Sequence, residues 1–386
     1  MRILSCHNVV VPATTAHSLY TTRTSAELSL RARVLMIAAR GRSHHSFSSL
    51  YGFRREERPG LEISLPPSSN KPLSGLWRRA VAARWIANSS APGSFVYVTQ
   101  ARPLRQFARL RAGRRRRFIL VVECHSLREA WGSEITTADG LMFTSSALQS
   151  AMFERFPRLR EKPSFLSHHR IAAIPPVPEA CELERRDGPI RLGYVGSILP
   201  WKGLEVLIDA IRLLPDSFHA HIIGGTEGDE YRSKLIAFAR SQGVAERVRF
   251  TPFLPTDQLA STLRSLDCLV LPLAAEDQGS SPMKLLEYLA ASRPVIASDL
   301  PSIREVLTHR WNGLLFAPGD PQSLAIQARS LMETSLAERV QMISRGIDAL
   351  RPRTTDVWLA DLFAWLETLP AIRSRGEDAS CSPGSP

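Results

Sequence analysis

The feature that most constrains the fold is a regular alternation of short apolar runs with amphipathic helical stretches after about residue 190. Six runs have the length and composition of β-strands: 190–195, 220–223, 248–250, 268–273, 294–298 and 314–316. Most are separated by stretches with helical spacing, and after Lys202 the residues Leu204, Leu207 and Ile211 share one helix face. Strands that alternate with helices predict a parallel, doubly wound α/β sheet.

The first 180 residues repeat this alternation less cleanly, with candidate strands at 2–5, 33–38, 61–65, 95–99, 117–122 and 141–144. This alternation predicts a second doubly wound sheet, and a length of 386 residues is typical of two domains. The proline-rich stretch 175–178 and the charged stretch 182–189 read as a linker. We therefore expect domains at 1–180 and 181–353, a C-terminal helix at 354–370 that crosses back to the first domain, and a disordered tail at 371–386.

Composition excludes several classes of protein. No stretch approaches the roughly 20 uninterrupted apolar residues of a membrane span. At the N-terminus, Ser5, His7 and Asn8 interrupt what would be the apolar core of a signal peptide. The five cysteines have no pair spacing, which argues against zinc ribbons and disulfide scaffolds. We expect a cytoplasmic protein with no bound metal.

Charge is divided unevenly along the chain. Residues 1–180 carry 27 Lys and Arg against 11 Asp and Glu, whereas residues 181–386 carry 22 against 26. One interpretation of Arg111 and the run Arg114–Arg117 is a solvated loop. The other is contact with an anionic surface, either an acidic acceptor or the inner face of a membrane. No zinc-finger, RNA-binding or helix-turn-helix pattern accompanies these residues, so nucleic acid is not an expected partner.

Ligands of open parallel sheets bind at the carboxyl ends of the strands, and the loop at 193–203 follows one such end. Its glycines, Gly196 among them, allow close backbone approach. Lys202 stands directly before a helix, where the positive helix end disfavours a cation unless an anion such as a diphosphate lies there too. The alternative is an exposed lysine in a turn. Gly224 and Gly225 follow the next strand and are expected to line the same site.

The loop at 276–294 also follows a strand. Ser281 can cap the next helix, and Pro282 suits its first position. Lys284 and Glu287 then share one face of that helix, where a bare ion pair is worth only about 0.2–0.5 kcal/mol. The functional interpretation is that Glu287 accepts hydrogen bonds from ribose hydroxyls while the helix start meets phosphate oxygens.

A third candidate is His125, in the segment Glu123–Ser126 that follows the strand ending at Val122. A lone histidine is usually structural. The position of His125 at a strand's carboxyl end favours a place in a site.

These motifs, in this order, resemble the retaining "group 1" glycosyltransferases of the GT-B fold. The resemblance covers about residues 190–335 and is weaker in 118–125 and 138–146. It implies two Rossmann-like domains that face each other across a cleft, an acceptor-side domain at 1–180 and a nucleotide-sugar-binding domain at 181–353. It also implies transfer of a hexosyl unit from a UDP- or GDP-type sugar to an acceptor hydroxyl with retention, in polysaccharide, glycolipid or cell-envelope glycan synthesis. The acceptor would be a carbohydrate or lipid-linked, and no cofactor or metal is expected.

By this resemblance Lys202 holds the donor diphosphate, Glu287 holds the ribose, and His125 approaches the transferred sugar. The expected donor-binding residues are Gly196, Ser197, Lys202, Gly225, Ser281, Lys284 and Glu287.

Three departures from the family pattern bear on this assignment. Ser197 stands where the family usually has arginine, so the diphosphate would depend on Lys202 and Lys284. Gly279 stands where a glutamate precedes Glu287 by eight residues. The sugar-contacting carboxylate is then either missing or supplied by Glu276 or Asp277. The segment 14–17, which ends at His17, replaces the glycine-rich loop expected after the first strand.

Two alternatives remain open at this point. The substitutions at Gly279 and Ser197 favour a non-catalytic GT-B-like binding protein in a polysaccharide pathway. A sugar-nucleotide epimerase on the same fold is the other.

Overall fold

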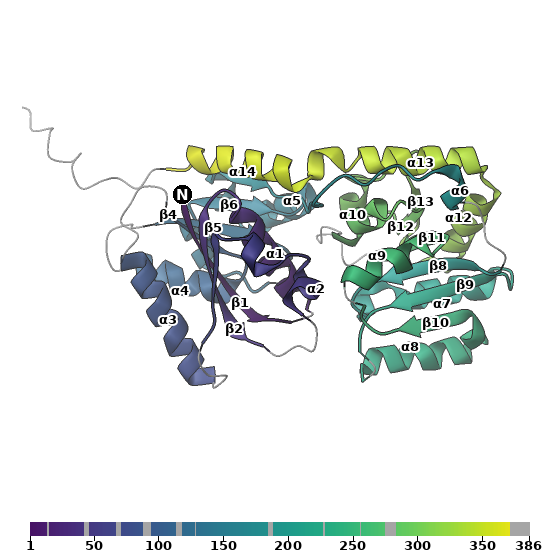
Figure 1. The fold of residues 1–386 in the computed structure, drawn as a ribbon, viewed down its shortest axis with the longest axis horizontal. Coiled ribbons are helices and arrows are strands. Elements are labelled where there is room, and N and C mark those ends of the chain that lie inside the picture. Colours follow the sequence, from purple (N-terminus) through teal and green to yellow (C-terminus); the bar gives the residue numbers. More distant parts are fainter. Residues whose placement is uncertain are drawn as a thin grey trace, which may run out of the picture. The chain divides into compact units, whose positions relative to one another are not determined.

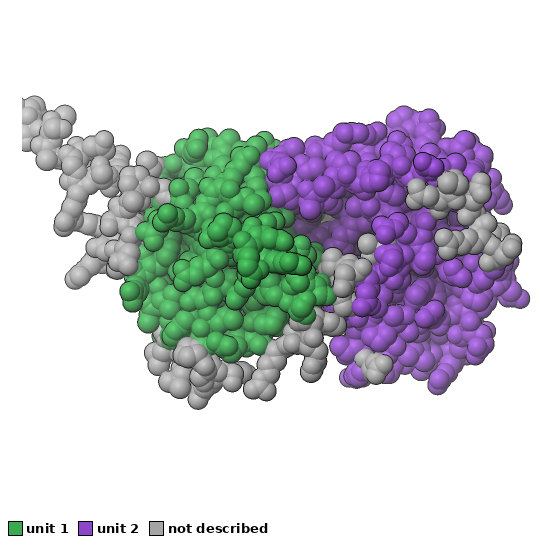
Figure 2. All heavy atoms as spheres, viewed as in Figure 1, with its two compact units in different colours: residues 1–143, 149–167, 359–386 green, residues 144–148, 168–358 purple. Residues whose placement is uncertain are grey.

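The structure is a computed structural model that describes residues 1–13, 15–41, 46–66, 71–87, 94–112, 118–127, 129–183, 188–226, 228–254, 256–274 and 283–370. Its contacts divide the chain into two compact units (Figure 2). Unit 1 comprises the described residues of Met1–Phe143, Gln149–Ser167 and Leu359–Pro386. Unit 2 comprises those of Thr144–Leu148 and His168–Trp358. The predicted tail at 371–386 lies outside the described residues.

The division after residue 167 differs from the predicted boundary at residue 180. The reason is a backbone bridge at Ile171, whose N–H donates to the Arg353 carbonyl and whose carbonyl accepts from Thr355 N–H, both at 2.9 Å. Ile171 is also buried among the apolar side chains of unit 2. The segment 168–180 therefore packs with unit 2, and the end of the predicted C-terminal helix, from residue 359, packs with unit 1.

Unit 1 contains a seven-stranded sheet with the strand order β3-β2-β1-β4-β5-β6-β7, and every recorded pairing is parallel (Figure 1). Its strands are β1 (Arg2–Val11), β2 (Arg33–Arg40), β3 (Leu61–Ser64), β4 (Ser94–Val98), β5 (Ile119–Cys124), β6 (Gly140–Phe143) and β7 (Ser164–Leu166). Its helices are α1 (Ala16–Leu28), α2 (Phe47–Tyr51), α3 (Lys71–Ala87), α4 (Ala101–Ala112) and most of α5 (Ser146–Arg155) and α14 (Thr355–Thr368).

Unit 2 contains a six-stranded parallel sheet with the order β10-β9-β8-β11-β12-β13 (Figure 1). Its strands are β8 (Ile190–Val195), β9 (Phe218–Ile223), β10 (Val248–Thr251), β11 (Cys268–Leu271), β12 (Val295–Ser298) and β13 (Leu314–Phe316). Its helices are α6 (Ala180–Leu183), α7 (Leu204–Leu213), α8 (Glu230–Ser241), α9 (Thr256–Arg264), α10 (Met283–Ala290), α11 (Pro301–Arg304), α12 (Pro321–Glu333) and α13 (Leu336–Asp348).

Two apolar cores explain why unit 2 is doubly wound. Alternate strand residues point to opposite faces of a sheet. In β11, Val270 belongs to a core completed by α7, α8 and α12, whereas Leu269 and Leu271 belong to a core completed by α9 and α10. Helices therefore cover both faces, as the alternation in the sequence predicts, and the predicted fold class of two doubly wound α/β sheets is confirmed.

Differences from the predicted elements lie mainly in unit 1. Strand β7 was not predicted, since only three residues form it and Leu166 is exposed. Strand β1 continues past Ser5 to Val11, and β5 continues past Val122 to Cys124. None of the described helices is long and apolar enough to cross a membrane.

Arg111 lies in the last turn of α4 and faces neither a solvated loop nor an anionic surface, so both interpretations of it are wrong. Its guanidinium donates to both carboxylate oxygens of Asp139 at 2.7 Å, and to the Thr137 carbonyl at 2.5 Å. Both charged side chains are less than one tenth exposed. Asp139 in turn accepts from Leu120 N–H in β5, so the pair ties α4 to the sheet. The run Arg114–Arg117 lies outside the described residues.

We expect Arg111→Met to lower the free energy of unfolding by about 3 kcal/mol, because the change leaves a buried carboxylate without its partner. Arg109→Met on the same helix is the control, since Arg109 is exposed and its loss should change stability by less than about 0.5 kcal/mol. Chemical denaturation followed by circular dichroism measures both. Equal destabilisation by the two changes would contradict the role of the ion pair.

Candidate active site

The first candidate loop lies where the strand order of unit 2 reverses, between β8 and β11. Ligands of doubly wound sheets bind at this point, outside the carboxyl ends of the strands. The chain leaves β8 at Val195, passes through a short 3-10 helix at Pro200–Lys202 and enters α7 at Leu204. Lys202 is half-buried and lies two residues before Leu204, the first residue of α7. Gly203 caps that helix without a side chain.

Glycine is required at Gly203 in this loop and at Gly224 in the loop after β9, because backbone meets backbone at both points. Gly203 has φ +64°, and a Cβ there would lie 1.9 Å from the carbonyl oxygen of Pro272. Gly224 has φ +147°, and its Cβ would lie 1.8 Å from the carbonyl oxygen of Gly196. Both φ values lie in the region that favours glycine. The loops after β8 and β9 therefore touch through main-chain atoms.

Two buried tyrosines hold the end of β8. The Tyr288 hydroxyl, from α10, accepts from Val195 N–H at 2.7 Å and donates to the Val195 carbonyl at 3.1 Å. The Tyr194 hydroxyl donates to the Ser197 carbonyl at 2.8 Å. The Ser197 side chain itself is exposed. The helix that carries Glu287 is thus joined through its next residue to the strand that precedes Lys202.

Helix α10 carries the second group of candidates. Lys284 Nζ donates to Glu287 Oε2 at 2.6 Å, so the structure brings these two side chains together, each about three-tenths exposed. Gly225, with φ +64°, lies against Ile198 across the loop after β8. Glu276, Asp277, Gly279 and Ser281 lie outside the described residues.

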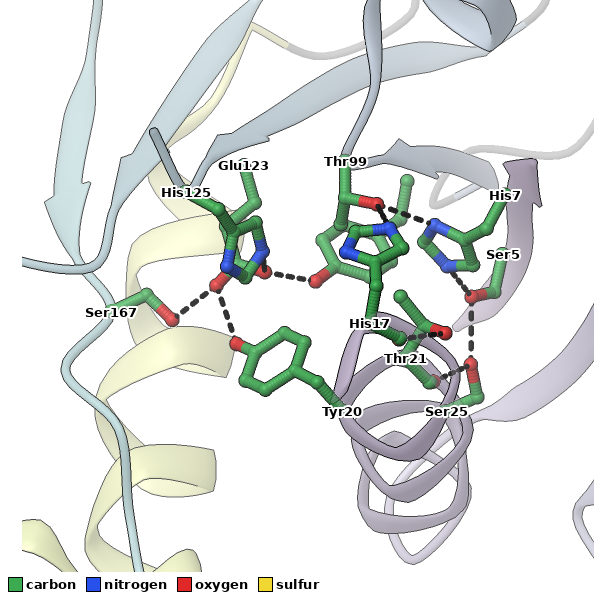
Figure 3. A network of polar contacts seen from close by, with 11 residues as sticks. Ser5, His7, His17, Tyr20, Thr21, Ser25, Thr99, Glu123, His125 and Ser167 are labelled. Atoms are coloured by element: carbon green, nitrogen blue, oxygen red, sulfur yellow. Dashed lines mark hydrogen bonds and ion pairs between the residues drawn. The ribbon is translucent and has the colours of Figure 1, made fainter. Parts of the chain in front are cut away.

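The third candidate region belongs to unit 1, and Glu123 is its centre (Figure 3). Glu123 is fully buried within β5 and does not lie in the loop that the sequence suggests. Oε1 accepts from Tyr20 at 2.9 Å and from Ser167 at 2.8 Å. Oε2 accepts from His125 Nε2 at 2.9 Å and from the Tyr97 hydroxyl.

Four donors keep this carboxylate ionised despite its burial. Burial alone would raise the pKa of Glu123, yet the charge of His125 and the hydrogen bonds from His125, Tyr97 and Ser167 hold that pKa well below its usual range. His125 is the first residue after β5, and its ring packs edge-to-face against Tyr20 at a centroid distance of 4.6 Å. The predicted site residue therefore has a buried negative charge behind it.

A second group of polar side chains lies beside this carboxylate, at the reversal point of the unit 1 sheet between β1 and β4 (Figure 3). His7 of β1 and His17 of α1 both contact the hydroxyl of Thr99, which directly follows β4. The rings of His17 and His125 are 5.8 Å apart. Burial is the main cause that lowers the pKa of His7 well below its usual value and that of His17 to about 4. Both rings are therefore neutral at neutral pH.

Sequence reasoning missed His7, Thr99 and the burial of Glu123. A signal was present for His7 and Glu123, because each interrupts an apolar run of the sequence. His17 was noticed only as part of an atypical loop. Among the described side chains, no three His, Cys, Asp or Glu residues converge to hold a metal ion.

Comparison with known proteins relates part of this chain to a family. A family model described as "Glycosyl transferases group 1" matches residues 189–334. A D-inositol 3-phosphate glycosyltransferase from Jonesia denitrificans is 33% identical over 39% of this chain and 37% of its own length. A 2-deoxystreptamine glucosyltransferase from Streptomyces kanamyceticus is 27% identical over 64% of this chain and 60% of its own length. The matched part is thus under two thirds of either relative.

Solved structures extend the likeness to the fold of nearly the whole chain. An Anabaena protein, Alr3699/HepE, solved in complex with UDP-glucose, superimposes with a TM-score of 0.73 over 96% of this chain and 100% of its own, at 18% identity. Residues 189–334 thus match the model of the group 1 glycosyltransferases, and the two doubly wound sheets have the GT-B fold.

Proposed function

We propose that the protein transfers a hexosyl unit from a UDP- or GDP-type nucleotide sugar to an acceptor hydroxyl, with retention of the anomeric configuration. Unit 2 binds the nucleotide sugar, and no metal or cofactor takes part. The activity serves polysaccharide, glycolipid or cell-envelope glycan synthesis, with a carbohydrate or lipid-linked acceptor. The family match over 189–334 and the UDP-glucose bound to the Anabaena neighbour support this assignment.

The observation that carries the proposal is the backbone contact between Gly196 and Gly224 at the reversal point of the unit 2 sheet. Because no side chain lies between these two glycines, their main-chain atoms lie directly against each other at the carboxyl ends of β8 and β9. Lys202 and the uncapped start of α7 are the groups there that attract an anion. A diphosphate matches this combination, since it supplies the negative charge that both groups require.

Glu287, which pairs with Lys284 on α10, accepts hydrogen bonds from ribose hydroxyls. Departure of the nucleoside diphosphate leaves an oxocarbenium-like sugar, so the departing oxygens need the most charge stabilisation. Lys202 supplies it. His125, held against Glu123, approaches the transferred sugar.

Product formation tests the proposal directly. Purified protein is incubated with radiolabelled UDP- or GDP-hexoses and with three acceptor sources: D-inositol 3-phosphate, 2-deoxystreptamine and a membrane extract. We expect a labelled glycoside from at least one pairing, with the donor's anomeric configuration by NMR. Donor binding without any product would favour a non-catalytic binding protein. Interconversion of the donor sugars without acceptor would favour an epimerase.

Replacing Lys202 with alanine should weaken UDP binding about ten- to a hundredfold, because the diphosphate loses a charge-assisted contact worth about 1.5–3 kcal/mol. Isothermal calorimetry with UDP and GDP measures the loss. Lys234→Ala is the matched control, since Lys234 is an exposed lysine of α8 paired with Glu230. Equal affinity of the wild type and the Lys202 variant would overturn the diphosphate assignment.

The same calorimetry examines Glu287→Gln, which should weaken UDP binding and leave the melting temperature nearly unchanged. The partly exposed pair with Lys284 contributes only about 0.2–1 kcal/mol to stability. A variant that melts much earlier and still binds UDP normally would show that Glu287 serves the fold.

Peripheral contact with an anionic membrane is the remaining part of the proposal. Exposed arginines on α3 and α4 support it: Arg79, Arg84, Arg102 and Arg109. Binding to phosphatidylglycerol vesicles should decrease as salt rises, because charges farther apart than about 8 Å are screened at physiological ionic strength. Replacing the four arginines with glutamine should reduce it. Equal binding to neutral phosphatidylcholine vesicles would contradict the contact.

A further inference from the structure

An unbroken chain of hydrogen bonds in unit 1 runs from a backbone carbonyl of α1 to the ring of His17 (Figure 3). Its five links are Ser25 Oγ to the Thr21 carbonyl at 2.8 Å, Ser5 Oγ to Ser25 Oγ at 2.7 Å, His7 Nε2 to Ser5 Oγ at 2.7 Å, Thr99 Oγ1 to His7 Nδ1 at 2.9 Å, and His17 Nε2 to Thr99 Oγ1 at 3.1 Å. We call these side chains the α1 relay: Ser25, Ser5, His7, Thr99 and His17.

The direction of every bond in the α1 relay follows from its first link. A carbonyl oxygen only accepts hydrogen bonds, so the single hydroxyl proton of Ser25 is donated to the Thr21 carbonyl. The Ser25 oxygen must then accept, and Ser5 must donate to it. Because Ser5 has no second proton, the Nε2 atom of His7 has to carry hydrogen and donate to Ser5.

The same logic fixes the tautomer of His17. His7 is neutral, since burial lowers its pKa, so its Nδ1 atom has a lone pair and accepts from the Thr99 hydroxyl. With its proton spent, the Thr99 oxygen accepts from His17 Nε2–H. Neutral His17 therefore has an unprotonated Nδ1 atom, and no hydrogen bond reaches Nδ1 from the described residues.

We infer that His17 Nδ1 is a fixed hydrogen-bond acceptor that binds a hydroxyl group of the acceptor substrate. The inference rests on the proposed function, which it deepens by naming the residue and the chemical group that meet on the acceptor side. Its support is geometric. His17 lies in the first turn of α1 at the reversal point of the unit 1 sheet, it is half-buried, and its ring lies 5.8 Å from that of His125.

This arrangement also selects the class of ligand. A ring nitrogen that accepts and does not donate binds O–H or N–H groups. It forms no hydrogen bond with an ionised phosphate or carboxylate oxygen, because neither atom carries a proton. The group that meets His17 is therefore a neutral hydrogen-bond donor such as a polyol hydroxyl, even where the substrate carries a phosphate elsewhere.

Nitrogen NMR of the full chain with ¹⁵N-labelled histidine tests the tautomer. His17→Gln assigns the resonances by their disappearance. We expect the unprotonated type of shift for Nδ1 and the protonated type for Nε2 at pH 7, with protonation of the ring only near pH 4. Nδ1–H as the main tautomer of the wild type would overturn the inference.

Thr99→Val should release this tautomer, because the isosteric side chain can neither donate to His7 nor accept from His17. The two nitrogen shifts of His17 then move toward each other. Thr22→Val is the matched control, since the buried Thr22 hydroxyl on α1 has no hydrogen-bond partner in the structure. Its His17 shifts should stay those of the wild type. An unchanged spectrum in Thr99→Val would show that the relay does not set the tautomer.

Ligand binding is tested with glycerol, myo-inositol and methyl α-D-mannoside, each added to the protein with UDP bound. At least one should shift the His17 Nδ1 resonance, and KM for that polyol should rise about two- to tenfold in His17→Gln, the range expected for one neutral hydrogen bond. His17→Asn, whose amide oxygen can take the place of Nδ1, should recover part of the loss. UDP affinity should not change in either variant.

The outcomes separate this inference from the proposed function. If UDP binds and depends on Lys202, yet no polyol moves the His17 Nδ1 resonance, the inference is wrong and the donor assignment stands. If a polyol moves that resonance while neither UDP nor GDP binds, the polyol site stands and the transferase proposal fails.

Discussion

A parallel sheet covered by helices on both faces leaves polar chemistry one place, the edge at which its strands end. Inside the sheet every side chain meets an apolar layer, and the backbone groups are spent on neighbouring strands. In this protein the residues with functional chemistry gather at those ends: Lys202 after β8, Glu287 on the helix after β11, His17 after β1 and His125 after β5. The rest of both candidate sites depends on this constraint.

Glu123 is a charged exception that measures how strict the constraint is. It lies one residue inside β5, and a bare carboxylate there would be strongly destabilising. Hydrogen-bond donors from four separate segments stabilise this carboxylate, among them Tyr20 of α1 and Ser167 after β7. A carboxyl group so fully satisfied is a rigid element, and it holds His125 from behind.

Prediction from the sequence succeeded where periodicity decides the structure. The bounds of β8 and β13 follow from apolar runs between turn residues, and the helix after Lys202 follows from its spacing. Prediction failed where a contact between residues distant in sequence determines the structure. His7 interrupts an apolar run and suggests the end of a strand, yet β1 continues because Thr99, 92 residues away, satisfies the ring.

The candidate donor loop shows the same division. Glycine and lysine at the end of a strand are visible in the sequence, and so is the pair Lys284 and Glu287. The sequence does not show that the Tyr288 hydroxyl forms hydrogen bonds with both backbone groups of Val195. An aromatic residue on an amphipathic helix is normally interpreted as part of the apolar core. The long-range hydroxyl contact is what joins α10 to the strand before Lys202.

The contact between Gly196 and Gly224 has a consequence for redesign. Because these loops meet through main-chain atoms, neither position offers a side chain with which to alter what binds there. In a saturation library Gly224 would tolerate almost nothing, whichever sugar or base was selected for. Diversity would accumulate instead at exposed neighbours such as Ser197. The backbone contact thus divides the site into positions that must stay glycine and positions whose side chains can vary under selection.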